Sequence, residues 1–336
     1  MQILRVLLLR LLTTAITLAG VAVIVFFVIR VVPGNPIAMM LPPGATDEDV
    51  ARLSALYGLD KPLITQFGIW LSGVMQGDFG TSITTRQPVL ELVLGRLPAT
   101  LELSIMALVM AVIMGGAAAL TGTRFRGGRT EGAIDVANGM ALSVPDFLWG
   151  LVLILLFGVL VPVFHISGRV TPSLELPFTT DFYLFESLFR LRFDLWADIV
   201  AHMFMPALAL AIPLAAIIGQ LLKQSLKETM HLDYVTLART KGYGENHVIT
   251  REALPNAILP TLTLVGVQFT FLIGGTVIIE RLFSYEGLGN MAIDAVINRD
   301  LPLIQGIVIL FAVIFTGVNL IVDLLYTVLN PRLRHG

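Results

Sequence analysis

The stretch D-Y-V-T-L-A-R-T-K-G-Y-G, residues 233–244, lies between two long apolar stretches of the chain. Tyr234, Ala238 and Gly242 follow one another at intervals of four residues, so this spacing predicts that they share one face of a helix. The side chains on that face become small toward its end, where another surface has room to approach. The stretch therefore indicates a helix that docks onto a partner.

The residues after this helix predict a turn and then a second helix. Gly242 and Gly244 predict the turn, because glycine disfavours a helix interior. Apolar residues then predict a short helix before the chain returns to apolar sequence: Val248, Ile249 and Leu254. A helix, a glycine turn and a helix together fit a docking element, and the alternative is a solvated loop that only joins two apolar stretches.

The composition excludes most soluble classes of protein. Apolar residues make up 56% of the 336 residues and charged residues only 14%, and the mean hydropathy is +0.84. Soluble proteins average about 25% charged residues, so a soluble enzyme, a disordered chain and a nucleic-acid binder are all disfavoured. The formal charge of −2 gives no basic field, and the lack of cysteine excludes disulfides and thiolate metal sites.

Six stretches are long and apolar enough to cross a membrane as helices, which takes about 20 residues each. They cover residues 7–29, 99–121, 133–163, 199–222, 259–279 and 304–329. Pro145 interrupts the third, because proline breaks a helix. The first is too long for the core of a signal peptide. The sequence thus predicts an all-α membrane protein with six transmembrane helices.

The distribution of Lys and Arg predicts the orientation of these helices. Segments 1–10, 122–132, 223–258 and 331–336 hold 12 of these cations in 63 residues. The other side comprises segments 30–98, 164–198 and 280–303, which hold the other 10 cations in 128 residues. Cytoplasmic loops are richer in cations, so the first group and both termini are expected in the cytoplasm.

The long first outer loop, residues 30–98, is predicted to contain local structure of its own. Residues 47–56 are amphipathic and Thr46 can cap them as a helix. A second helical run is expected to end at Met75, followed by a turn at residues 77–80.

Four acids fall within the apolar stretches, where a charge is costly and therefore calls for an explanation. Glu102, Asp135 and Asp323 lie near helix ends, so a structural role is favoured for them. Asp146 follows Pro145, which frees a backbone carbonyl, and it is the candidate for lining a polar substrate path.

No catalytic, cofactor or metal site is expected. The chain has no GxxxxGK[ST], HExxH or GxSxG motif. The histidines fall in different segments without the spacing of metal ligands: His165, His202, His231, His247 and His335.

The docking stretch and the sequence after it resemble the EAA loop of type I ABC-transporter permeases of the peptide/nickel branch. The residues that match are Asp233, Tyr234, Val235, Ala238, Arg239, Lys241, Gly242, Leu254, Pro255, Asn256, Ala257 and Pro260. Glu252 stands where that branch usually has histidine. Other motifs match in order along nearly the whole chain: residues 33–36, 59–62, 77–82, 96–103, 167–169, 283–289 and 322–332. Asn35 and Asn330 replace the usual aspartates. The long first outer loop is similar to that of the dipeptide-type B subunits.

The resemblance implies a type I ABC permease architecture with a long periplasmic loop after the first helix. Residues 1–30 would be the N-terminal transmembrane helix, 31–98 the periplasmic loop region, and 331–336 a cytoplasmic tail. Residues 99–330 would form a five-helix core that carries the coupling loop at 223–258. The coupling residues carried over are Asp233, Tyr234, Ala238, Arg239, Lys241, Gly242 and Asn256.

The resemblance also implies a transport function and partners. The chain would be the permease subunit of an ATP-driven importer of di- and oligopeptides in the bacterial inner membrane. Its partners would be a second homologous permease, two ATP-binding subunits that hold ATP and Mg, a periplasmic substrate-binding protein and membrane lipid, but no nucleic acid. A nickel or glutathione importer is the alternative within the branch. An ion-coupled secondary transporter and an intramembrane aspartyl protease are the alternatives from other classes.

Overall fold

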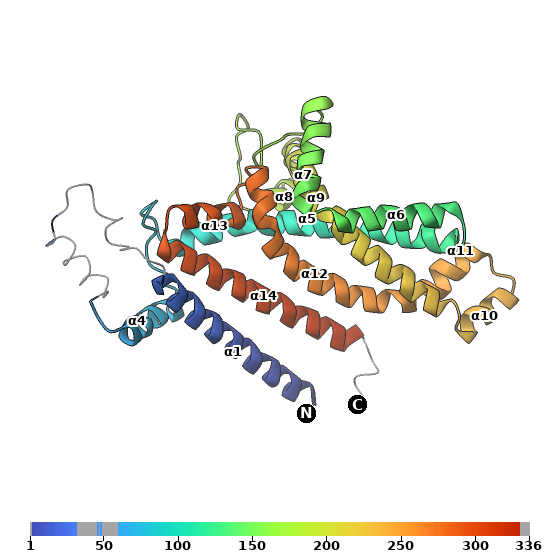
Figure 1. Cartoon of the computed structure of the whole chain (residues 1–336), viewed down its shortest axis with the longest axis horizontal. Coiled ribbons are helices and arrows are strands. Elements are labelled where there is room, and N and C mark those ends of the chain that lie inside the picture. The colour runs from blue at the N-terminus through green and yellow to red at the C-terminus, as the bar shows by residue number, and fades with distance from the viewer. Residues whose placement is uncertain (1, 32–45, 47, 49–59, 330–336) are drawn as a thin grey trace. The chain divides into compact units, whose positions relative to one another are not determined.

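The computed structural model describes residues 2–31, 46, 48 and 60–329, and this part of the chain is mostly helical (Figure 1). Between Gly80 and Val89 an isolated antiparallel bridge joins Thr81 to Pro88. The helices are α1 (Gln2–Val31), α4 (Leu63–Met75), α5 (Val89–Arg124), α6 (Arg129–Ser143), α7 (Asp146–Leu153), η1 (Ile154–Leu160), α8 (Tyr183–Phe189), α9 (Phe193–Thr229), α10 (Asp233–Thr240), α11 (Glu245–His247), η2 (Val248–Ala253), α12 (Leu254–Leu282), α13 (Leu288–Ile297) and α14 (Leu301–Leu329).

Within the described residues, five helical runs are long and apolar enough to span a membrane, and they coincide with five of the predicted stretches. They are α1, α5, α9, the run from α11 to α12, and α14. The sixth stretch corresponds to the pair formed by α6 and α7 with η1, which passes the same test of length and composition only when the two bent helices are taken together. The predicted all-α membrane fold is confirmed.

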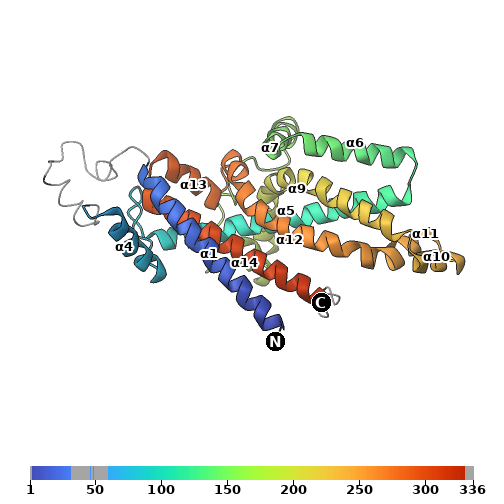
Figure 2. The same ribbon diagram turned by 60° about the horizontal axis from the view of Figure 1, so that its bottom comes forward.

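The bent span breaks at the predicted place. The axes of α6 and the α7–η1 run meet at 103°, and the two helices leave their junction in different directions in both views (Figure 2). Val144 is extended with ψ 124°, as expected for a residue before proline. Pro145 has ψ 149° and lacks an amide hydrogen, so α6 cannot continue through it.

The chain divides into two compact units, of which the first comprises residues 1–97 and 290–316. In this unit α1 packs against α4 through Phe26, Phe67 and Trp70, whose ring centroids lie 5.2–6.0 Å apart. The predicted helical run to Met75 is confirmed as α4, and the turn after it has Gly77 and Gly80 at positive φ. Apart from Glu48, the predicted helix at residues 47–56 lies outside the described residues.

The second unit comprises residues 98–289 and 317–336, and α9 lies in its core. In the most apolar 18-residue segment of α9, 67% of the residues are buried. Gly115 of α5 and Gly219 of α9 allow close helix contact, because a Cβ at Gly115 would lie 2.5 Å from the Ala215 carbonyl oxygen. This glycine pair therefore serves packing within the chain.

Candidate functional site

The predicted docking helix forms as α10 and is held by its apolar side. Val235 and Ala238 are buried, and they belong to one apolar cluster with Leu226 of α9 and with Val248 and Ala253 of η2. The helix that follows the glycine turn starts at Glu245 and continues through η2 into α12. The predicted order of helix, glycine turn and helix is confirmed.

The predicted face of small residues is not presented to a partner. Ala238 is only 5% exposed because it packs into the apolar cluster, whereas Tyr234 is 38% exposed. Gly242 lies beyond the end of α10 at Thr240 and has left the helical conformation, with φ +85°. The prediction of one shared docking face formed by these three residues is wrong.

Gly242 instead ends the helix. Its amide donates to the Arg239 carbonyl at 2.9 Å, and the Tyr243 amide donates to the Ala238 carbonyl at 3.4 Å. This pair of hydrogen bonds, with a left-handed residue between them, is the Schellman arrangement, in which glycine is favoured because it has no Cβ. The predicted glycine turn therefore has Gly242 at a position that requires positive φ.

Two polar contacts tie the ends of the loop together. The Asn256 amide nitrogen donates to the Tyr234 hydroxyl at 2.8 Å, which joins α10 to the first turn of α12. Arg239 forms an ion pair with Glu245 at 2.8 Å across the glycine turn. Glu245 was not among the predicted site residues, since only the fold brings it to Arg239.

Exposed apolar side chains gather on the loop around these contacts. Asp233 and Lys241 are exposed at the two ends of α10, as their charges require. The exposed fractions are 49% for Leu232, 54% for Leu237 and 48% for Tyr243. Sequence reasoning missed these three, although Leu237 lies three residues from Tyr234 and thus on the same side of α10. These exposed apolar side chains are therefore accessible to another protein.

Asp146 is the first residue of α7 and is half-buried. Its carboxylate accepts a hydrogen bond at 2.8 Å from the Phe147 amide. A negative charge at a helix N-terminus is favourable, so this position accounts for the residue locally and leaves part of the carboxylate accessible.

Glu102 lies in a buried polar network, which agrees with the structural role favoured for it. Its carboxylate is 0% exposed and accepts hydrogen bonds from Arg169 at 2.7 Å and from the Leu184 amide at 2.9 Å. The Arg169 guanidinium also lies over the Tyr183 ring, 3.9 Å from its centroid. A buried ion pair needs such additional partners to offset the loss of hydration.

The network extends to the segment between α12 and α13. Thr100 donates to Glu280 at 2.7 Å and accepts from the Leu288 amide at 2.8 Å. Gly287 packs so closely on the Glu280 carboxylate that a Cβ would overlap it. Burial raises the pKa of Tyr285 above its ordinary value although Arg169 opposes the shift, so its hydroxyl remains protonated. Three motifs far apart in the sequence thus meet at one buried site.

The other two acids of the apolar stretches lie within α6 and α14, and Asp135 is near the middle of α6 rather than at its end. Asp135 of α6 pairs with Lys223 of α9 at 2.8 Å, and Glu131 pairs with the same ammonium at 2.7 Å. Asp323 lies in α14, and its side chain is outside the described part of the structure.

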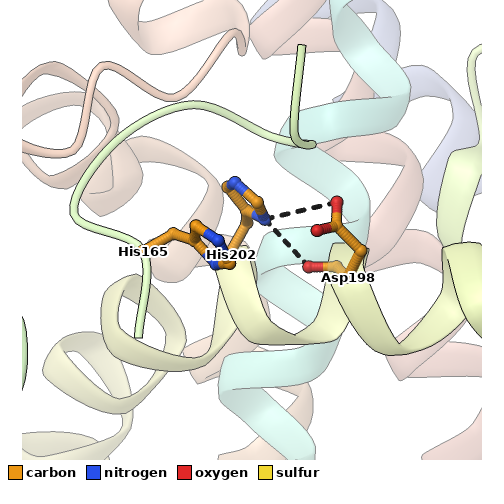
Figure 3. A group of neighbouring side chains, drawn as sticks. All are labelled: His165, Asp198 and His202. Atoms are coloured by element: carbon orange, nitrogen blue, oxygen red, sulfur yellow. Dashed lines mark hydrogen bonds and ion pairs between the residues drawn. The ribbon is translucent and has the colours of Figure 1, made fainter. Parts of the chain in front are cut away.

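The histidines are not all kept apart, contrary to expectation. His165 and His202 stack with ring centroids 3.9 Å apart, and Asp198 lies beside them (Figure 3). The two histidines are 37 positions apart in the sequence, one in a loop and one in α9. Their spacing therefore could not predict this group, because the loop and the helix come together only in the fold.

Two family models match the chain. The model described as binding-protein-dependent transport system inner membrane component matches residues 107–335, and its N-terminal companion matches residues 3–104. The dipeptide transport system permease protein of Escherichia coli (strain K12) is 38% identical, with 95% of both chains covered. The di/tripeptide transport system permease protein of Pseudomonas aeruginosa (strain UCBPP-PA14) is 36% identical, again with 95% of both covered. The glutathione transport system permease protein of Salmonella choleraesuis (strain SC-B67) is 32% identical, with 97% of both covered.

Proposed function

The chain belongs to the family of binding-protein-dependent transport system inner membrane components, and from this premise we propose that it is a permease subunit of an ATP-driven importer of di- and oligopeptides. The observation that carries the proposal is similarity over 95% of the chain to two permeases named for dipeptide or di/tripeptide transport. The substrate path would run between this chain and a second homologous permease. ATP and Mg would be bound by two partner ATPases, and a periplasmic binding protein would deliver the peptide.

In this proposal the loop around α10 couples the permease to an ATPase. Its exposed side chains, Leu232, Tyr234, Leu237 and Tyr243, supply the apolar contacts, and Asp233 and Lys241 flank them with charge. Contact with a moving ATPase would displace α10. The hydrogen bond from Asn256 to Tyr234 and the shared apolar cluster would pass this displacement to α12.

One face of α12 is a suitable contact surface for the second permease. Gly274 and Gly275 have no atom within 4 Å of an added Cβ, and Phe271 and Ile278, one turn away on either side, are 63% and 55% exposed. Small residues in membrane helices permit close approach between helices. Because the chain has no cysteine, Gly274→Cys offers a unique site for cross-linking to a cysteine in the second permease.

The proposed location is the bacterial inner membrane with both termini in the cytoplasm. The higher density of Lys and Arg in segments 1–10, 122–132, 223–258 and 331–336 supports this orientation. Reporters fused within residues 123–131 or after Arg334 are expected to read cytoplasm, and one near Gly44 to read periplasm. A reversed reading at any of the three positions contradicts the six-helix topology.

The function is tested by uptake in a strain that lacks this chain. Complementation should restore ATP-dependent uptake of a radiolabelled dipeptide, and the purified chain alone should not hydrolyse ATP. Glutathione is the second candidate substrate, because one relative carries that name. Restored uptake of glutathione or nickel without restored dipeptide uptake would replace the peptide assignment, and uptake that persists without the ATPases would indicate an ion-coupled transporter.

A further inference from the structure

We propose that His165, Asp198 and His202 form a binding site for a divalent transition-metal ion of the zinc, cobalt or nickel type. One ligand atom from each side chain can be chosen so that all three lie within 4.8 Å of one another. Bonds from such an ion to imidazole nitrogen and carboxylate oxygen are about 2.0–2.2 Å long. The His165 and His202 rings lie stacked with an interplanar angle of 7°, so their nitrogen lone pairs do not converge. One ion can contact all three groups once the exposed His165 ring turns out of this stack.

The helix α9 supplies two of the three ligands in a fixed relation. Asp198 and His202 are four residues apart, so both lie on one side of the helix (Figure 3). The Asp198 backbone carbonyl accepts a hydrogen bond from His202 Nδ1 at 2.9 Å, and the Asp198 carboxylate lies 3.5 Å from the same nitrogen. A carbonyl that holds one ring nitrogen fixes the orientation of the imidazole, as is usual for metal-binding histidines.

The third ligand comes from the loop between η1 and α8, and neighbouring contacts hold this loop against α9 and the end of α12. Phe164 stacks on Phe204 with centroids 4.5 Å apart, directly beside the stack of His165 on His202. The Gly168 amide donates to the Phe283 carbonyl at 3.0 Å. His165 is thus placed by the packing of its neighbours.

The carboxylate is oriented by a residue of the same loop. Thr171 donates to the two oxygens of Asp198, from its amide at 2.9 Å and from its hydroxyl at 2.7 Å. Ligating carboxylates are commonly held by such outer hydrogen bonds. Each carboxylate oxygen retains a second lone pair for an ion.

Burial and donor type select the ion. His202 is 4% exposed, Asp198 is half-buried and His165 is exposed, so the group opens to solvent on the side of His165. Two imidazoles and one carboxylate suit zinc, cobalt, nickel or copper, whereas calcium and magnesium prefer oxygen ligands. Three protein ligands leave positions for water. In the orientation proposed from the distribution of Lys and Arg, the site lies on the outer side of the membrane.

The test is metal binding by the full chain in lipid nanodiscs, purified with a tag that contains no histidine. Zn²⁺, Co²⁺ and Ni²⁺ are titrated separately, with calorimetry for stoichiometry and the visible absorption of Co²⁺ for coordination. The wild type is expected to bind one ion per chain. His165→Ala and His202→Ala should each abolish this binding, and Thr171→Val should weaken it about tenfold, the lower end of the usual effect of an outer-shell partner.

His231→Ala and His247→Ala are the matched controls, because both residues are exposed and lie in the loop around α10, away from this group in the sequence. Both should bind the ion as the wild type does. His165 is exposed, so its variant is expected to fold even if that of the buried His202 does not. Absence of binding to the wild type, or binding that His165→Ala leaves unchanged, would overturn the proposal.

Discussion

The side-chain amide nitrogen of Asn256 donates a hydrogen bond of 2.8 Å to the hydroxyl of Tyr234, so the first turn of α12 is tied to α10 across 22 residues of sequence. Both side chains are exposed, and the bond bridges the helix that would meet an ATPase and a helix of the membrane core. A hydrogen bond at this place suits the transfer of motion more than it suits stability, since its net contribution to folding is about 0.5–1.5 kcal/mol.

We therefore expect Tyr234→Phe and Asn256→Ala to reduce peptide uptake per ATP hydrolysed while the ATPases still co-purify. The double variant should lose no more than either single variant, because all three lack the same bond. Uptake and ATP turnover are measured together in proteoliposomes that contain the whole transporter. Additive losses would mean that the two side chains act separately.

Gly242 and Gly244 form a matched pair that isolates backbone strain. Neither has an atom within 4 Å of an added Cβ, but Gly242 has φ +85° and Gly244 has φ −65°. A side chain at the left-handed position costs roughly 1–2 kcal/mol. Gly242→Leu is expected to distort the turn and weaken ATPase binding by about 2 kcal/mol, which is roughly a 30-fold loss of affinity. Gly244→Leu should change the affinity for the ATPase little. Co-purification and transport rates test this, and equal behaviour of the two variants would show that the turn only connects helices.

Removal of one partner from the Arg169–Glu102 pair should be severe. Arg169→Met leaves the buried carboxylate without its counter-charge, which typically costs about 3–5 kcal/mol. The double variant Arg169→Met with Glu102→Gln should recover part of that loss, because no unpaired charge remains. Thermal unfolding in detergent measures the two single variants, Arg169→Met and Glu102→Gln, and the double variant, with the exposed Arg251→Met as the control. If the double variant loses the sum of the single losses, the two residues are not energetically coupled.

Asp146→Asn separates a role in the substrate path from a role at the start of α7. Asparagine keeps a side-chain oxygen for the Phe147 amide but removes the charge. Altered peptide uptake with normal assembly of the transporter is expected if the charge faces the path. Unchanged uptake would leave only the local contact at the helix N-terminus, and failed assembly would show that the charge stabilises the fold.

The spans and their interruption could be predicted because both are local properties of the sequence. Apolar runs of about 20 residues define the helices, and Pro145 alone defines the break between α6 and α7. The positive φ of Gly242 could also be predicted, since the turn after α10 needs a residue without a Cβ.

The convergence of distant segments could not be predicted in this way. The burial of Ala238 depends on η2, which packs against it from the far side of the glycine turn. The stacking of His165 on His202 depends on how a loop folds back onto α9. The periodicity of one segment carries no information about its contacts with a distant segment. For this reason the sequence predicts the wrong docking face and does not predict the histidine group.

The ion pair of Glu102 with Arg169 also constrains the order of events during biosynthesis. Arg169 is synthesised 67 residues after Glu102, which at about 5–20 residues per second is a delay of roughly 3–13 s. Glu280, the partner of Thr100, follows still later. The buried acid of α5 is therefore synthesised before its counter-ion, and we expect the insertion machinery to shield this end of α5 until the later helices emerge. Truncated nascent chains that stop before Arg169 should accordingly remain bound to that machinery longer than chains that extend past it.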